Sequence, residues 1–363
     1  MSRIKGNLII PSHSELKHFD LPSDNFFIGP YLILIMCKSN LEHYEPPDKT
    51  KSPKFIKSEV LRDLNSRRAR IVIDPSIKDT LNLVAGQNLE STVSKLCSFP
   101  NRHSKSQNIH HVSDWLLNEL KNIGYDGTFF HKYSQDGFDL ENVISNKNGS
   151  TEGNNGESML LCAHYDTILK QNGDDIVSKA PGANDNASGV AALLEIARVI
   201  YPLSLGRNIQ FAFFSGEEQG LWGSTHYAHY MKDKGLNLHT VVNMDMCGEP
   251  GFLPSNTTTY IDIDDGQTGI VSTNNEASKN FGLIMQGLAN TYTNIDTLFD
   301  PIDASDYMPF EARGYVCIGA YDGSAISTNL HYHDKSDTIE NIDFGFLSEV
   351  TKMVLAFILT EAR

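Results

Sequence analysis

The stretch that most constrains this chain is Phe211–Ser224, in which an apolar run leads directly into two adjacent carboxylates. Residues 209–214 have the length and aromatic content of a buried strand, and Ser215-Gly216 then requires a turn. Glu217 and Glu218 follow, at the end of a strand where α/β proteins bind ligands. Two like charges there repel each other, so the pair predicts a bound cation or a proton on one carboxyl group. A solvated Glu-Glu turn is the alternative that this stretch alone leaves open.

The composition is that of a soluble protein, and the length has room for one large domain, alone or with a small companion. The chain has 363 residues, of which 40% are hydrophobic and 21% are charged. Its net charge of −15 argues against nucleic acid and anionic membranes as partners. The five cysteines are odd in number and widely spaced, which predicts neither a disulfide framework nor a zinc finger.

No stretch of the sequence is long and apolar enough to predict a membrane span. The most apolar early segment is Phe26–Cys37, which Gly29-Pro30 interrupts. It has no basic leader and no small-residue cleavage site, so it does not read as a signal peptide.

Strands and helices alternate after Asn88. The periodicity predicts helices over 110–123 and 187–200, strands over 142–145, 159–163 and 240–244, and a C-terminal helix with Leu347, Val350, Val354, Phe357 and Ile358 on one face. This alternation predicts an α/β fold. We expect a three-layer sandwich with a central, mostly parallel mixed β-sheet flanked by helices, plus a small N-terminal unit.

We expect two parts in the chain. Residues 1–85 are predicted to form a separate small unit, with strands at Tyr31–Met36 and Ala69–Asp74. Lys and Arg outnumber Asp and Glu between residues 49 and 78, in contrast to the acidic remainder. Residues 86–363 are predicted to form the catalytic domain.

More acidic and imidazole side chains lie where other predicted strands or turns end, at His164, Asp166, Asp185, Asp245, His331 and His333. Each has an ordinary structural explanation: Asp185, for example, precedes a helix and suits an N-cap. Jointly they predict His, Asp, Glu, Asp and His converging at one sheet edge. Five N and O ligands from separate strand ends suit two zinc ions that share one carboxylate.

These motifs resemble the two-zinc aminopeptidases of the bacterial leucyl aminopeptidase type. The resemblance is carried by His164-x-Asp166, Asn184-Asp185-Asn-x-Ser-Gly189, Glu217-Glu218-x-Gly220-Leu-x-Gly223-Ser224, Asn243-Met-Asp245 and Tyr332-His333-x-x-x-Asp337-Thr338, with Leu96–Arg102 similar to the opening of the family's catalytic domain. It covers about Gln87 to the C-terminus, and it implies that residues 1–85 are an accessory or propeptide-like unit, since many secreted members of the family carry a propeptide in this position. The chain departs from the family at Asp334, where a small Thr is common, and at Ser305-Asp306-Tyr307, where many relatives have Ser-Asp-His.

The resemblance implies a role for each motif residue. Asp185 would bridge two zinc ions per subunit; His164 and Asp245 would complete one site, and Glu218 and His333 the other. Glu217 would be the general base, Asp166 would orient His164, and Tyr332 would donate a hydrogen bond to the developing oxyanion. The spacing alone leaves His331 open as a ligand in place of His333, and the motif favours His333. The substrates implied are peptides or proteins with a free N-terminus.

Three other functions stay open at this point. A glutaminyl cyclase would use one zinc for an intramolecular reaction, but it usually carries a Trp before the last histidine, where this chain has Tyr332. A non-catalytic binding module would have lost ligands, and here every ligand position is filled. A carboxypeptidase would need an Arg for the terminal carboxylate, for which Arg313 is the candidate. We expect a monomer, and the resemblance suggests a secreted or periplasmic protein.

Overall fold

The computed structural model of the chain describes residues 2–4, 8–10, 73–150, 157–170, 175–250, 258–263, 275–299, 304–322 and 329–362. Strands β1 (Ser2–Ile4) and β2 (Leu8–Ile10) form an antiparallel pair within a unit of residues 1–45, and the remaining elements belong to a second unit. The predicted strand Tyr31–Met36 lies outside the described residues. So does Ala69–Asp74 except for its last two residues, and the predicted boundary at residue 85 stays a prediction.

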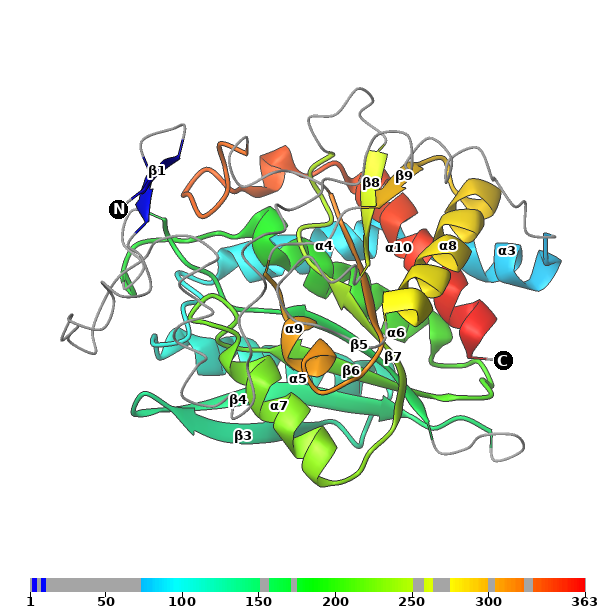
Figure 1. The fold of residues 1–363 in the computed structure, drawn as a ribbon, viewed down its shortest axis with the longest axis horizontal. Helices are drawn as coiled ribbons and strands as arrows, with labels where there is room; N and C mark the ends of the chain where they lie inside the picture. Colours follow the sequence, from blue (N-terminus) through cyan, green and yellow to red (C-terminus); the bar gives the residue numbers. More distant parts are fainter. Residues whose placement is uncertain are drawn as a thin grey trace. The chain divides into compact units, whose positions relative to one another are not determined.

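An eight-stranded mixed sheet forms the centre of the described second unit (Figure 1). Its strands are β3 (Phe129–Gln135), β4 (Phe138–Lys147), β5 (Ser158–His164), β6 (Asn208–Phe214), β7 (Leu238–Met244), β8 (Thr258–Ile263), β9 (Asp296–Phe299) and β10 (Cys317–Tyr321). Their order is β3-β4-β6-β5-β7-β10-β8-β9. The central strands β6, β5, β7 and β10 are parallel, whereas β4 and β8 run antiparallel to their central neighbours.

Helices cover both faces of the sheet. They are α3 (Pro75–Leu81), α4 (Gly86–Ser98), α5 (Asn108–Ile123), α6 (Gly189–Ile200), α7 (Trp222–Asp233), α8 (Asn275–Tyr292), α9 (Met308–Glu311) and α10 (Phe344–Glu361). Alternate residues of the strands point to opposite faces: Leu161 joins the core under α4, α5, α6, α8 and α10, whereas Leu160 packs with α7 and α9. The predicted three-layer α/β sandwich is confirmed (Figure 1).

The strand register decides where the functional groups meet. In the parallel ladder His164 lies opposite Phe214 of β6, and Cys162 lies opposite Asn243 of β7. The carboxyl ends of β5, β6 and β7 are therefore level with one another at one edge of the sheet. Side chains within a few residues of these ends are brought together, although they are far apart in sequence.

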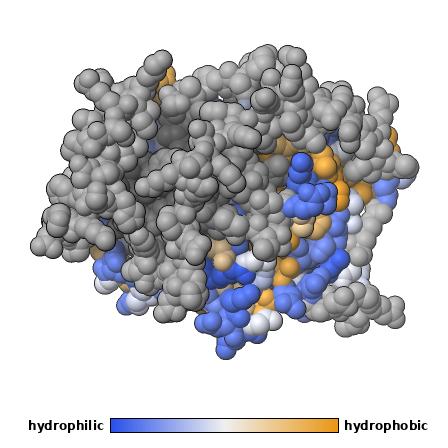
Figure 2. All heavy atoms as spheres, viewed as in Figure 1, coloured by the Kyte–Doolittle hydropathy of each residue, from blue (hydrophilic) through white to orange (hydrophobic). Residues whose placement is uncertain are grey.

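Figure 2 shows the face seen in Figure 1, where hydrophobic residues appear in the region of α8 among hydrophilic ones. Leu283 of this helix is one of the partly exposed large hydrophobic residues. None of the described helices is both long and apolar enough to cross a membrane.

Helix α3 packs against the same core as the helices that follow it. Ile77 and Leu81 are buried in the main hydrophobic cluster, which also contains residues of α10. The backbone N–H of Asp74 donates to the Tyr292 hydroxyl at 2.7 Å, and Glu195 of α6 accepts from the backbone N–H of Ala85 at 2.7 Å. The segment just before residue 86 is thus tied to the core by apolar packing and by hydrogen bonds.

These contacts give a test in the full-length protein. Leu81 is 3% exposed, so Leu81→Ala should lower the free energy of unfolding by about 2–5 kcal/mol through lost burial and a new cavity. Leu83, two residues further along the chain, is 58% exposed. Leu83→Ala should therefore change the free energy of unfolding by less than about 0.5 kcal/mol. Denaturant unfolding of both variants makes the comparison. Equal stability of the two would show that α3 does not belong to the core.

Candidate metal centre

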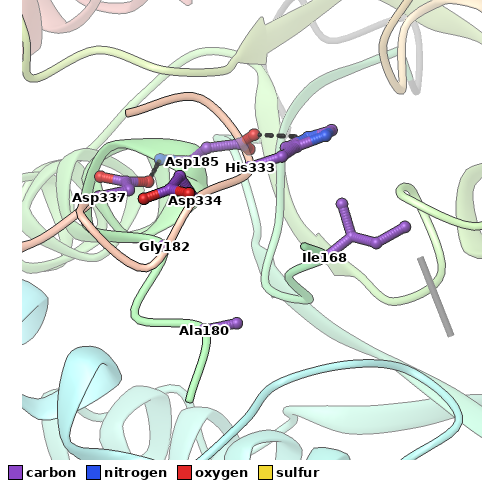
Figure 3. A pocket seen from close by; sticks show the side chains of 7 residues that line it. All are labelled: Ile168, Ala180, Gly182, Asp185, His333, Asp334 and Asp337. Carbon is purple, nitrogen blue, oxygen red and sulfur yellow. Dashed lines mark hydrogen bonds and ion pairs between the residues drawn. The ribbon is translucent and has the colours of Figure 1, made fainter. Parts of the chain in front are cut away.

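One carboxylate lies between two histidines at the carboxyl edge of the sheet. The Oδ1 atom of Asp185 is 3.3 Å from Nε2 of His164, and its Oδ2 atom is 3.0 Å from Nε2 of His333. Asp185 lies in the segment Ala183–Ser188 that leads into α6, and its own backbone departs from helical geometry, with φ −108° and ψ 92°. Figure 3 shows the Asp185–His333 contact, beside a small pocket also lined by Ile168, Ala180, Gly182, Asp334 and Asp337.

Each histidine faces a second carboxylate as well. His164 Nε2 is 3.3 Å from Oδ1 of Asp245, which follows β7. His333 Nε2 is 2.9 Å from Oε2 of Glu218, which follows β6. The described residues thus form two groups of one imidazole and two carboxylates, with Asp185 common to both. Ligands about 2.0–2.2 Å from a tetrahedral zinc lie roughly 3.4 Å apart, which is close to these separations.

Buried polar atoms in the site support its fit to metal ions. Nε2 of His333 and Oε1 of Glu218 are buried and have no hydrogen-bond partner among the described residues. The short contacts of His333 Nε2 therefore lack hydrogen-bond geometry. Ligand atoms of His164, Asp185 and Glu218 all lie within 4.8 Å of one another. Buried polar atoms without partners are costly, and a bound cation would satisfy them.

The pKa values of the site reflect crowded acidic groups in a buried place. Burial raises the pKa of Glu218 to about 7, and the nearby Asp185 adds to the effect. Burial also raises the pKa of Glu217 well above its usual range, with Glu218 contributing. Although burial opposes it, Glu218 and Asp185 raise the pKa of His333 to about 10. The site therefore holds several acidic side chains and little positive charge, and a bound metal ion would supply the missing positive charge.

Asp166 connects the ends of two neighbouring strands. Its Oδ1 and Oδ2 atoms accept hydrogen bonds from the backbone N–H groups of Glu217 and Glu218, at 3.2 and 3.3 Å. Its Oδ1 atom is also 3.6 Å from Nδ1 of His164. One carboxylate therefore holds the turn after β6 beside the end of β5.

The structure adds two residues to which the sequence motifs assigned no role. Asp337 accepts from the backbone N–H groups of Asn184 and Asp185, at 2.8 and 3.0 Å. Ser305 donates to Oδ2 of Asp245 at 2.6 Å and accepts from the Asn243 amide at 2.7 Å. Both residues stand inside motifs visible in the sequence, but spacing alone does not show which backbone or side-chain groups they contact.

Arg102 fixes the turn that precedes Asp185. Its guanidinium is fully buried and donates hydrogen bonds to the carbonyl oxygens of Leu96, Tyr165, Pro181 and Gly182. Gly182 has a φ of 52°, and a Cβ atom there would collide with Thr167 and with the Asp185 carbonyl. The path of the chain into Asp185 thus depends on a buried cation and on a glycine.

The structure distinguishes the two histidines near the C-terminus. His333 lies between Asp185 and Glu218, whereas Nδ1 of His331 contacts the Ser336 hydroxyl at 2.9 Å. The Tyr332 ring stacks on His333 with centroids 3.7 Å apart. Burial, together with Asp185 and Glu218, raises the pKa of the Tyr332 phenol well above its usual range, so it keeps its proton as a donor.

Arg313, the residue a carboxypeptidase would need, lies away from this edge. It precedes β10, a strand parallel to β7, and its Nη1 atom donates to the Pro309 carbonyl at 2.6 Å. The neighbouring Tyr315 bonds to the Leu236 carbonyl, just before β7 begins. This places Arg313 toward the amino ends of the parallel strands, opposite the metal-binding edge.

Comparison with known proteins identifies relatives of this chain. Residues 142–358 match the profile of peptidase family M28. A probable leucine aminopeptidase of Trichophyton verrucosum is 26% identical over 283 residues, which are 75% of this chain and 72% of that protein. A probable zinc metalloprotease of Pyrenophora teres f. teres is 31% identical over 196 residues, but the match spans 48% of this chain and only 39% of that protein.

Solved structures share the fold. LapB from Legionella pneumophila aligns with a TM-score of 0.69 at 21% identity, and the alignment covers 86% of this chain and 83% of the LapB chain. An aminopeptidase from Aneurinibacillus has a TM-score of 0.64 at 16% identity, covering 79% and 96%. A glutaminyl cyclase from Porphyromonas gingivalis has a TM-score of 0.61 at 22% identity, covering 77% and 99%. At these identities the likeness shows the fold and does not separate peptidases from cyclases.

The match to a family profile defines the class of protein to which this chain belongs. Since the matched residues span more than half of its length, the chain belongs to peptidase family M28. This confirms the resemblance and the enzyme class predicted from the motifs.

Arg102 offers a test of how the centre is held. Arg102→Met leaves four buried carbonyl groups without their charged donor, so the free energy of unfolding should fall by at least about 3 kcal/mol. Arg313→Met is the matched control, because this half-buried residue donates to the carbonyl of Pro309 in the short helix α9 just before it, and the change should cost less than about 1 kcal/mol. Denaturant unfolding compares them. A similar loss in both would contradict a special role for Arg102.

Proposed function

We propose that this protein is an aminopeptidase that binds two zinc ions per chain. His164, Asp185 and Asp245 would hold one ion, and Asp185, Glu218 and His333 the other. The observation that carries the proposal is the position of Asp185, whose two oxygens face different imidazoles. A single-metal site has no need of a second imidazole on the far side of the same carboxylate.

The reaction proposed is hydrolysis of the first peptide bond of a substrate. Bound zinc supplies Lewis-acid chemistry, which polarises a carbonyl group and makes water acidic. Glu217 removes a proton from the attacking water and returns it to the leaving amine. Its buried position beside Glu218 raises its pKa and so favours proton uptake. The Tyr332 hydroxyl donates to the oxyanion, and Asp166 orients His164.

The substrates proposed are peptides or proteins with a free N-terminus. Two observations support this class. Several relatives are named probable leucine aminopeptidases, and the site presents several carboxylates to an incoming ammonium group. The expected monomer, the location outside the cytoplasm and the accessory role of residues 1–85 stay predictions.

Removal of the metal should abolish the activity. We expect a dialysed, zinc-free preparation to release no product from aminoacyl-anilides, and added zinc to restore the rate. Acetylation of the substrate's amino group should stop turnover by the zinc-loaded enzyme. Full activity in a verified metal-free preparation, or equal cleavage of acetylated peptides, would contradict the proposal.

The same preparation separates hydrolysis from cyclisation. A peptide with N-terminal Gln should yield free Gln and a shortened peptide, which mass spectrometry distinguishes from a pyroglutamyl product. Conversion to the pyroglutamyl peptide without hydrolysis would assign the chain to the cyclase chemistry known from structures that share its fold.

Glu217 and Glu218 provide the sharpest test, since they are adjacent and differ in proposed role. Glu217→Gln keeps the shape but loses basicity, so it should retain two zinc ions while kcat falls by about 10²–10⁴. Glu218→Gln should instead weaken one zinc site and regain part of its activity in excess zinc. Zinc content and kcat of both variants decide the matter. Loss of zinc in Glu217→Gln but not in Glu218→Gln would reverse the two roles.

A further inference from the structure

The loop that carries His333 has an unusual backbone. The N–H of Asp334 donates to the His331 carbonyl at 3.0 Å, so residues 331–334 form a tight turn with Tyr332 and His333 at its centre. His333 has a φ of 54°. This is the left-handed region, which glycine occupies easily and a side chain with a Cβ atom does not. Contacts outside the turn must hold His333 in this conformation.

The start of this turn is fastened by side chains. His331 contacts the Ser336 hydroxyl through Nδ1, and its backbone N–H donates to Oδ1 of Asn329 at 2.8 Å. The Asn329 amide in turn donates to Oε2 of Glu249 at 3.2 Å. The other oxygen of Glu249, Oε1, is 4.0 Å from Nε2 of His331. One carboxylate therefore reaches two residues of the loop just before His333.

Glu249 is itself anchored to the opposite side of the centre. It follows Asp245 by four residues, on the loop that leaves β7. Its backbone N–H donates to Oδ2 of Asp322 at 3.3 Å, and the same oxygen accepts from the Asn184 amide at 2.6 Å. Asn184 immediately precedes Asp185. The Glu249 backbone is thus fixed near Asp185 and Asp245, and its side chain reaches the loop that carries His333.

We propose that Glu249 and His331 are a positioning pair that sets the place of His333 relative to Asp185. The inference rests on the proposed two-zinc site and goes beyond it, because neither residue belongs to the proposed ligand set. Side-chain exposure is 12% for Glu249 and 31% for His331, so the pair is only partly screened by water. Groups bonded directly to a metal ligand typically contribute 10–100-fold to metal affinity, and this pair acts one step further away, through the loop that carries His333, so we expect an effect at the lower end of that range. The effect would fall on the zinc ion that Glu218 and His333 are proposed to hold.

The test measures stepwise zinc binding to the metal-free, full-length protein by calorimetry. Wild type should bind two equivalents. Glu249→Ala should bind one equivalent as tightly as wild type and the other about 10-fold more weakly, with an unchanged unfolding temperature of the metal-free protein. Glu249→Gln keeps an acceptor for Asn329 and should recover part of the affinity. His331→Gln should show the same selective loss.

A matched pair elsewhere supplies the control. His239 near the start of β7 and Glu361 at the end of α10 contact each other at 3.2 Å, away from the carboxyl edge of the sheet. Glu361→Ala should leave both zinc equivalents unchanged. Two unchanged equivalents in Glu249→Ala, or equal weakening of both, would overturn the inference alone. Fewer than two equivalents in wild type would overturn the two-zinc proposal, and this inference with it.

Discussion

The centre depends on the contact of one carboxylate with two imidazoles. Asp185 faces His164 on one side and His333 on the other, and its backbone N–H is held by Asp337. Burying acidic groups so close together is unfavourable unless positive charge is brought to them. The surrounding elements position these groups. Parallel strands bring them to one edge of the sheet, and the buried Arg102 fixes the turn that leads into Asp185.

Much of this arrangement could be predicted from sequence, because the site follows simple rules of strand order. The apolar runs that end at His164, Phe214 and Met244 are strands of the parallel ladder, as their length and composition indicated. Polar residues after parallel strands gather at one edge whatever the loops between them do. The alternation of strands and helices was enough to predict the layers, since each sheet face must be covered.

The contacts that steer the ligands could not be predicted in the same way. The bond from Ser305 to Asp245 spans sixty residues, and those from Asp337 to Asn184 and Asp185 span about one hundred and fifty. No periodicity encodes such pairs, because they depend on how loops of irregular shape fold over the strand ends. Helix α3 was not predicted, for a related reason. It is short, with only Ile77 and Leu81 buried, and it lies next to a charged stretch, so only the packed core shows which face is buried.

The shared edge of β5, β6 and β7 also links metal binding to folding. The groups that surround Asp185 come from chain segments between residues 164 and 333, so no short fragment contains them all. An ion that needs the whole set binds the native state and leaves the unfolded chain largely alone. By mass action, zinc bound at the proposed site would stabilise the folded protein in proportion to the logarithm of its free concentration, once that concentration is well above the dissociation constant. The supply of metal in the surroundings would set the fraction of chains that are occupied, and through it both the survival of the protein against proteolysis and its total activity.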